Sequence, residues 1–111
     1  MVRVAVLVSG GGSNFGAMLK AQAEGALPGV EFVLVLSSKA GVGALDRAKK
    51  AQIPIAVVER KAFATEEAYE VALLERLLSA RADVVCLAGF LRKIGPGIIK
   101  QFRGRMLNIH P

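Results

Sequence analysis

The chain has 111 residues, 53% of them hydrophobic, and its 15 basic and 9 acidic side chains give a formal net charge of +6. One domain is the default at this length, and the apolar fraction excludes a disordered chain. No apolar run reaches the roughly 18 to 20 residues that span a bilayer, and Met1–Ser9 lacks the length and the cleavage site of a signal peptide. We therefore expect one folded domain, residues 1–111, in the cytoplasm and without a membrane partner.

The only cysteine, Cys86, lies inside the apolar run Val84–Leu87. A lone cysteine cannot form a disulfide or a cysteine-rich metal site within one chain. We expect a buried structural thiol and no metal site.

The positive charge is concentrated in one stretch. Residues 1–90 hold ten basic and nine acidic side chains, whereas residues 91–105 hold five basic ones and no acid. The five are Arg92, Lys93, Lys100, Arg103 and Arg105. Such a stretch favours an anionic partner, either a phosphate or a polycarboxylate, unless it is simply a solvated face. Phe102 is its only aromatic residue, so the pattern does not favour nucleic-acid binding.

Short runs rich in Val, Ile and Leu alternate with longer amphipathic stretches, which is typical of βαβ units. The first run is almost unbroken in its apolar character, which indicates a parallel strand buried on both faces. In chain order the pattern predicts a strand at Val2–Val8, a helix at Asn14–Glu24, a strand at Phe32–Leu36, a helix at Ala44–Gln52, a strand at Ile55–Val58, a helix that begins after Thr65, a strand at Asp83–Leu87, a helix at Pro96–Phe102 and a strand at Arg105–Ile109.

The helix after Thr65 has the clearest pattern. Thr65 can cap its start, and Glu66 and Glu67 stand in its first turn, where the helix dipole favours negative charge. Its leucines recur at helical spacing on one face. They are Leu73, Leu74, Leu77 and Leu78.

Strands and helices that alternate in this way predict an α/β fold, with a Rossmann-like, mostly parallel sheet and helices on both faces. Such sheets bind ligands beyond the carboxyl ends of their strands. Three loops there carry suggestive residues, and we expect all three at the same edge. They are Ser9–Asn14 after the first strand, Ala88–Arg92 after the fourth, and Asn108–Pro111 at the end of the fifth.

The first loop places three consecutive glycines before a helix N-terminus, where backbone N–H groups attract phosphate. A GxGxxG dinucleotide motif fails at Phe15, and the second strand ends in Ser37-Ser38 without an acid to hold a ribose. A Walker A motif fails at Ala17, where lysine is required. The loop therefore fits a monophosphate best. The alternative is an ordinary glycine turn whose helix is capped by Ser13 or Asn14.

The last loop holds the only histidine of the chain, His110, two residues after Asn108. In a strand this spacing turns both side chains to the same side. An amide donor beside an imidazole suits acyl transfer, since one group binds the developing oxyanion and the other moves a proton. Either residue can equally be structural.

Taken together, these stretches resemble the phosphoribosylglycinamide formyltransferases, and the resemblance runs nearly end to end. It is carried by Val6–Asn14, Asp83–Arg92 and Gly104–Pro111. The resemblance implies transfer of a formyl group from 10-formyltetrahydrofolate to the amine of glycinamide ribonucleotide in purine biosynthesis. These two small molecules are the implied partners, with 10-formyltetrahydrofolate as the formyl-donor co-substrate.

The same resemblance implies a role for each site residue. Gly12, Ser13 and Asn14 match the family's phosphate loop. Asn108 matches the amide that binds the formyl oxygen, and His110 matches the general acid-base. The folate-binding segment that lies against the pterin matches Leu91, Arg92, Lys93 and Ile94, together with Asn108.

Two departures from the family stand out. Glu66 stands where many members have an arginine associated with folate binding, so we leave it out of the site. The family's chains are also about twice as long, and beyond the Asn-x-His-Pro motif they hold an Asp that raises the pKa of the histidine. Met1 followed at once by a strand resembles a true start, so we expect a chain truncated after Pro111. Such a chain is expected to bind ribonucleotide phosphate poorly and to catalyse little or nothing.

Three alternatives remain at this stage. Formyltetrahydrofolate deformylase shares the sheet and the Asn-x-His motif but normally carries a domain ahead of the first strand. Methionyl-tRNA formyltransferase has Gly-Thr-Pro in its first loop. The third alternative is a phosphate-binding α/β module without catalysis, in which Asn108 and His110 are structural.

Overall fold

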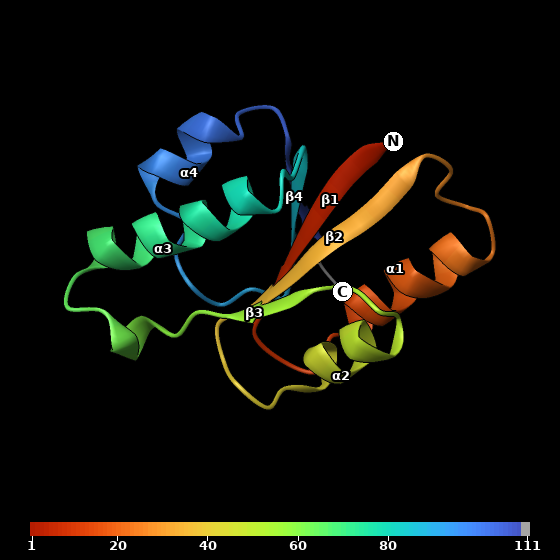
Figure 1. Ribbon diagram of the computed structural model, residues 1–111, viewed down its shortest axis with the longest axis horizontal. Helices are drawn as coiled ribbons and strands as arrows, with labels where there is room; N and C mark the ends of the chain where they lie inside the picture. The colour runs from red at the N-terminus through yellow and green to blue at the C-terminus, as the bar shows by residue number, and fades with distance from the viewer. Residues whose placement is uncertain (110–111) are drawn as a thin grey trace.

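The computed structural model describes residues 1–109 and shows one parallel sheet flanked by helices (Figure 1). The strands are β1 (Val2–Val8), β2 (Val30–Ser37), β3 (Ile55–Val57), β4 (Val84–Ala88) and β5 (Met106–Ile109). The helices are α1 (Ser13–Ala23), α2 (Gly43–Lys50), α3 (Glu66–Ser79) and α4 (Pro96–Gln101), with a short 3-10 turn, η1 (Arg60–Ala62), that the sequence pattern does not predict. The predicted strands and helices are otherwise confirmed, with bounds that differ by no more than about two residues.

The strand order is β3-β2-β1-β4-β5, and every pairing is parallel. The chain moves outward from β1 to β3, crosses back to β4 beside β1, and ends in β5. The loops after β1 and β4 therefore leave the sheet in opposite directions, which is the switch point where such sheets bind ligands. One irregularity lies between Val4 and Ala5, where β2 holds an extra residue opposite β1.

Helices α1 and α2 cover one face of the sheet, and α3 and α4 cover the other (Figure 1). Successive side chains of β1 alternate between the two apolar clusters. Val4, Val6 and Val8 pack on the side of α1 and α2, whereas Ala5 and Leu7 pack on the side of α3 and α4. All five are buried, so the prediction of a central strand buried on both faces is confirmed.

Helix α3 begins as predicted, because Thr65 Oγ1 accepts a hydrogen bond from the backbone N–H of Ala68 at 3.1 Å. Its leucine face is only partly correct. Leu73 and Leu77 are buried, but Leu78 is 49% exposed. The helix presents one narrow row to the sheet, and spacing alone does not distinguish that row from its neighbour on the same face.

Candidate active site

The glycine loop between β1 and α1 is fixed by close packing against α2. Gly12 caps α1 in the left-handed conformation, with φ at +76°, and a Cβ at this position would lie 2.6 Å from the Cβ of Ala44. A side chain would be strained by the backbone conformation and would also collide with α2. Gly12 is therefore required here by the fold, whatever the loop binds.

The first turn of α1 has no side-chain cap. The cap residue is Gly12, so the interpretation that Ser13 or Asn14 caps the helix is wrong. Ser13 is exposed and Asn14 is half-buried, and both belong to the first turn of the helix. The amide groups that open α1 therefore remain without a side-chain acceptor, which is the arrangement that a phosphate can use.

Helix α2 holds the carbonyl groups of the same loop. The backbone N–H of Ala44 donates to the carbonyl oxygen of Gly10 at 3.3 Å, and Arg47 Nε donates to that of Gly11 at 3.2 Å. Because acceptors of the loop are already bound to α2, the loop is left with unpaired donors. The loop thus offers N–H groups rather than carbonyl groups to a ligand.

A buried serine joins this loop to two others. Ser9 Oγ lies 2.6 Å from Ser38 Oγ, and it accepts a hydrogen bond from the backbone N–H of Leu91 at 2.9 Å. Ser9 and Ser38 are only 3% and 4% exposed. The ends of β1, β2 and β4 are therefore bound together at one point. Sequence analysis missed this pair, since two serines in separate loops carry no local pattern.

The segment after β4 is held at its start and open beyond it. The left-handed Gly89, with φ at +73°, turns the chain out of the strand. Leu91 follows with its backbone bound to Ser9, but its side chain is 77% exposed. Ile94 is half-buried and packs against the cluster under α3. An exposed apolar side chain on a fixed backbone is suited to contact a flat ligand.

The two basic residues of this segment line different hollows. Arg92 lines one together with Ser38, Lys39 and Arg60, after the ends of β2 and β3. Lys93 lines another together with Tyr69 and Glu70 of α3. The predicted folate-binding segment therefore divides the carboxyl edge into two sides.

Asn108 lies on β5 opposite Leu87 of β4, which in turn pairs with Leu7 of β1. The residue is exposed. It stands in the same row across the sheet, two residues before the loops that begin at Ser9 and Gly89. The expectation of a common edge is thus confirmed for the loops after β1 and β4 and for Asn108. His110 lies outside the described residues.

Glu66 does not take up the role of the arginine it replaces. Its Oε1 binds Arg60 Nε at 3.0 Å, and Arg60 also donates to the carbonyl oxygen of Phe63 at 2.8 Å. Glu66 thus helps to hold η1 at the start of α3. Its exclusion from the site agrees with this contact.

Tyr69 lies beside this ion pair with its hydroxyl group buried. No described residue is a hydrogen-bond partner of that hydroxyl group. Burial raises the pKa of Tyr69 above its ordinary value, and the positive charge of Arg92 opposes this shift. Tyr69 therefore stays protonated at neutral pH.

Within residues 1–109, no group of three or more His, Cys, Asp or Glu side chains is arranged to hold a metal ion. No described helix combines the length and the apolar character that a bilayer crossing needs.

Residues 2–111 match the model of the protein family described as formyl transferase. The chain belongs to this formyl transferase family. Among solved structures, glycinamide ribonucleotide transformylase 1 from Symbiobacterium toebii is 37% identical, with a TM-score of 0.93 over 100% of this chain and 52% of that one. Phosphoribosylglycinamide formyltransferase from Brucella melitensis is 43% identical, with a TM-score of 0.90 over 99% of this chain and 57% of that one.

A curated relative of this formyl transferase family chain is the trifunctional purine biosynthetic protein adenosine-3 of Drosophila pseudoobscura pseudoobscura. The two are 49% identical over 111 residues, which cover 98% of this chain and 8% of that protein. The chain thus spans about half the length of the solved structures and a small part of the curated relative. The expected family and fold are both confirmed.

Proposed function

We propose that the protein transfers the formyl group of 10-formyltetrahydrofolate to the amine of glycinamide ribonucleotide, in purine biosynthesis. One observation carries this proposal. In a chain of the formyl transferase family, the uncapped glycine loop is bound through Ser9 to the segment that begins at Leu91. A phosphate site and a folate site at fixed separation are what transfer between two bound substrates requires. A cytoplasmic location is part of the proposal and rests on the resemblance.

The proposal divides the edge of the sheet between the two substrates. Gly12, Ser13 and Asn14 receive the ribonucleotide phosphate, through backbone amides and the start of α1. The segment from Leu91 to Ile94 receives the pterin, largely through its backbone. Asn108 and His110 act between them. No metal ion takes part in this scheme.

The reaction is an acyl transfer without an oxidation or a reduction. The substrate amine attacks the formyl carbon, and a C–N bond forms while the carbonyl oxygen gains negative charge. The side-chain amide of Asn108 donates a hydrogen bond to that oxygen, and His110 moves the proton from the attacking amine to the departing nitrogen of tetrahydrofolate. The tetrahedral intermediate then collapses and releases tetrahydrofolate.

We expect Asn108→Ala to lower kcat by about 100- to 1000-fold, as loss of one oxyanion donor does in other acyl-transfer enzymes. The residue is exposed on an edge strand, so the change leaves the fold intact. Gln101→Ala, which removes another exposed amide, is the matched control and keeps wild-type turnover. Formyl transfer is measured by the absorbance of the folate product.

The outcomes separate the alternative functions. Turnover that survives Asn108→Ala contradicts the mechanism. Release of formate without an amine acceptor identifies a deformylase, and tight phosphate binding without any turnover identifies a binding module. The expectation that the 111 residues alone turn over little stays a prediction, and measuring intact mass and activity on one sample tests it.

A further inference from the structure

A basic hollow lies beside the proposed folate segment, where three loops meet at the carboxyl edge of the sheet. Its volume is about 330 Å³. The loop after β2 contributes Lys39, the loop after β3 contributes Arg60 and Lys61, and the loop after β4 contributes Arg92. Four cationic side chains from distant parts of the sequence therefore converge on one cavity.

Few acids balance these cations. Glu59 is the one acidic residue in the lining, and its Oε2 lies 3.9 Å from Lys61 Nζ, at the limit of an ion pair. Arg60 is paired with Glu66, whose side chain is 62% exposed. Lys39 and Arg92 form no ion pair within the described residues. Exposed pairs of this kind contribute little, so the hollow keeps a positive potential that attracts anions.

The hollow differs in kind from the glycine loop. The backbone N–H of Lys39 already donates to Ser37 Oγ at 3.1 Å, so recognition falls to side chains rather than to a row of amides. The cations come from three separate loops. Side chains spread in this way suit an anion whose charges are separated along a chain, and the guanidinium groups suit carboxylates in particular.

We propose that this hollow binds a flexible chain that carries several carboxylates. Arg92 joins the hollow to the segment that begins at Leu91, which favours one source, an oligo-γ-glutamate tail on the formyl donor. That source rests on the proposed function. A free polycarboxylate has the same chemistry and is the other source that the test distinguishes.

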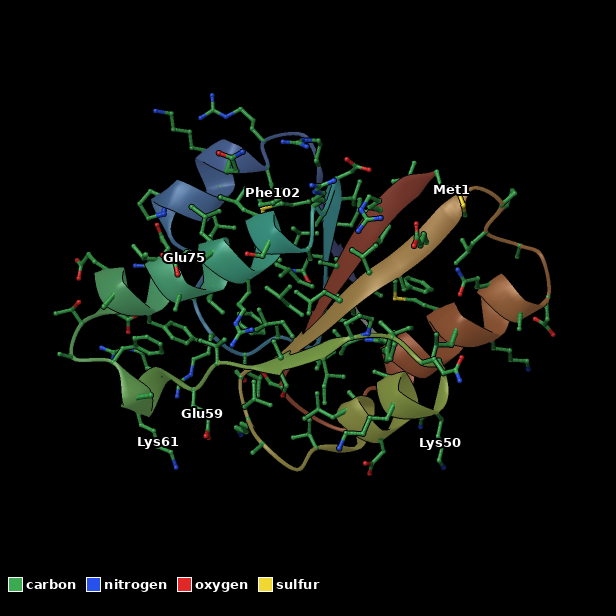
Figure 2. The ribbon with its side chains drawn as sticks, in the orientation of Figure 1. Met1, Lys50, Glu59, Lys61, Glu75 and Phe102 are labelled. Carbon is green, nitrogen blue, oxygen red and sulfur yellow. The ribbon has the colours of Figure 1, made fainter. Side chains whose placement is uncertain are left out.

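The test uses two double variants of equal charge. Lys39→Gln with Lys61→Gln neutralises two exposed lysines of the hollow, and Lys49→Gln with Lys50→Gln neutralises two exposed lysines of α2. Figure 2 shows Lys50 and Lys61 far apart, on α2 and at η1 respectively. Calorimetry measures the binding of free penta-γ-glutamate and of 10-formyltetrahydrofolate with a monoglutamate or a pentaglutamate tail.

We expect the hollow variant to bind the pentaglutamate probes roughly 2- to 25-fold more weakly than wild type, with a smaller dependence on salt. Its affinity for the monoglutamate is expected to change less, and the α2 variant is expected to match wild type throughout. Tighter binding of the pentaglutamate folate than of the monoglutamate identifies the donor's tail as the source. Binding of the free peptide without that difference identifies a separate polycarboxylate.

Equal losses in both double variants would overturn the inference, since they would reflect overall charge alone. So would absence of peptide binding together with equal affinities for the two folates. Formyl transfer with either of these results leaves the proposed function standing and removes the hollow. Peptide binding at the hollow without any formyl transfer does the reverse.

Discussion

The hydroxyl group of Ser9 positions the segment after β4, because it accepts the backbone N–H of Leu91 and also contacts Ser38. We expect Ser9→Ala to free this segment and to raise the KM for the formyl donor about 5-fold, as a loss of about 1 kcal/mol gives. The expected change in kcat is smaller. Steady-state kinetics with each substrate varied in turn measures both constants.

Ser38→Ala is the matched control for Ser9. It removes the same serine pair but leaves the contact between Ser9 and Leu91 in place. Its expected effect is a loss of stability without a change in donor KM, and Ser9→Thr, which keeps a hydroxyl group, is expected to restore part of the donor affinity. Equal donor KM values in Ser9→Ala and Ser38→Ala would show that Ser9 only stabilises the fold.

At this scale the sequence indicates some residues and hides others. Gly12 stands in a run of glycines before a helix, and Asn108 and His110 stand in a short motif, so local spacing is enough to single them out. Ser9 and Ser38 become partners only because β1 and β2 lie side by side and the segment after β4 returns to them. Their role depends on the order of the strands, which the alternating pattern does not specify.

Helix α4 has only six residues, and its start is held by α3. Glu70 Oε1 accepts a hydrogen bond from the backbone N–H of Gly97 at 2.7 Å, and no α4 side chain or cap residue does so. We expect Glu70→Ala to lower the free energy of unfolding by about 1 kcal/mol, because this amide loses its acceptor. Urea denaturation measures the change.

Glu75→Ala removes the same charge from an exposed position of α3 and serves as the control. Its stability is expected to stay within about 0.5 kcal/mol of wild type. Equal losses in the two variants would attribute the effect to the charge of α3, and α4 would then start without help from Glu70.

The elements themselves follow closely from the sequence, because each uses a local rule. Thr65 caps α3 as predicted, and Val2–Val8 forms the central strand with the predicted bounds. What failed was finer. The exposure of Leu78 and the turn η1 depend on how α3 sits on the sheet, and the Arg60–Glu66 pair that holds this turn is not visible in the apolar pattern.

For the molecule as a whole, burial sets a limit on stability at alkaline pH. Desolvation raises the pKa of the Cys86 thiol above 9.0 and that of the Tyr69 hydroxyl above 10.0. Below pH 9 both groups are protonated in the folded and the unfolded protein, so they make no difference. As the pH rises further, the unfolded chain loses these protons first. Stability therefore falls, by at most about 1.4 kcal/mol per pH unit for each group.

Tyr69→Phe tests this account directly. At pH 8 the variant is expected to be as stable as wild type or up to about 1 to 2 kcal/mol more stable, because the buried hydroxyl group has no partner among the described residues. Between pH 9 and pH 11 its stability is expected to fall less than that of wild type. Tyr69 is the only tyrosine and there is no tryptophan, so the ultraviolet absorbance of tyrosinate in the folded protein reports its pKa without interference. A midpoint at or below 10.0, or parallel stability curves for the two proteins, would mean that water or a ligand reaches the hydroxyl group through the hollow between α3 and Lys93.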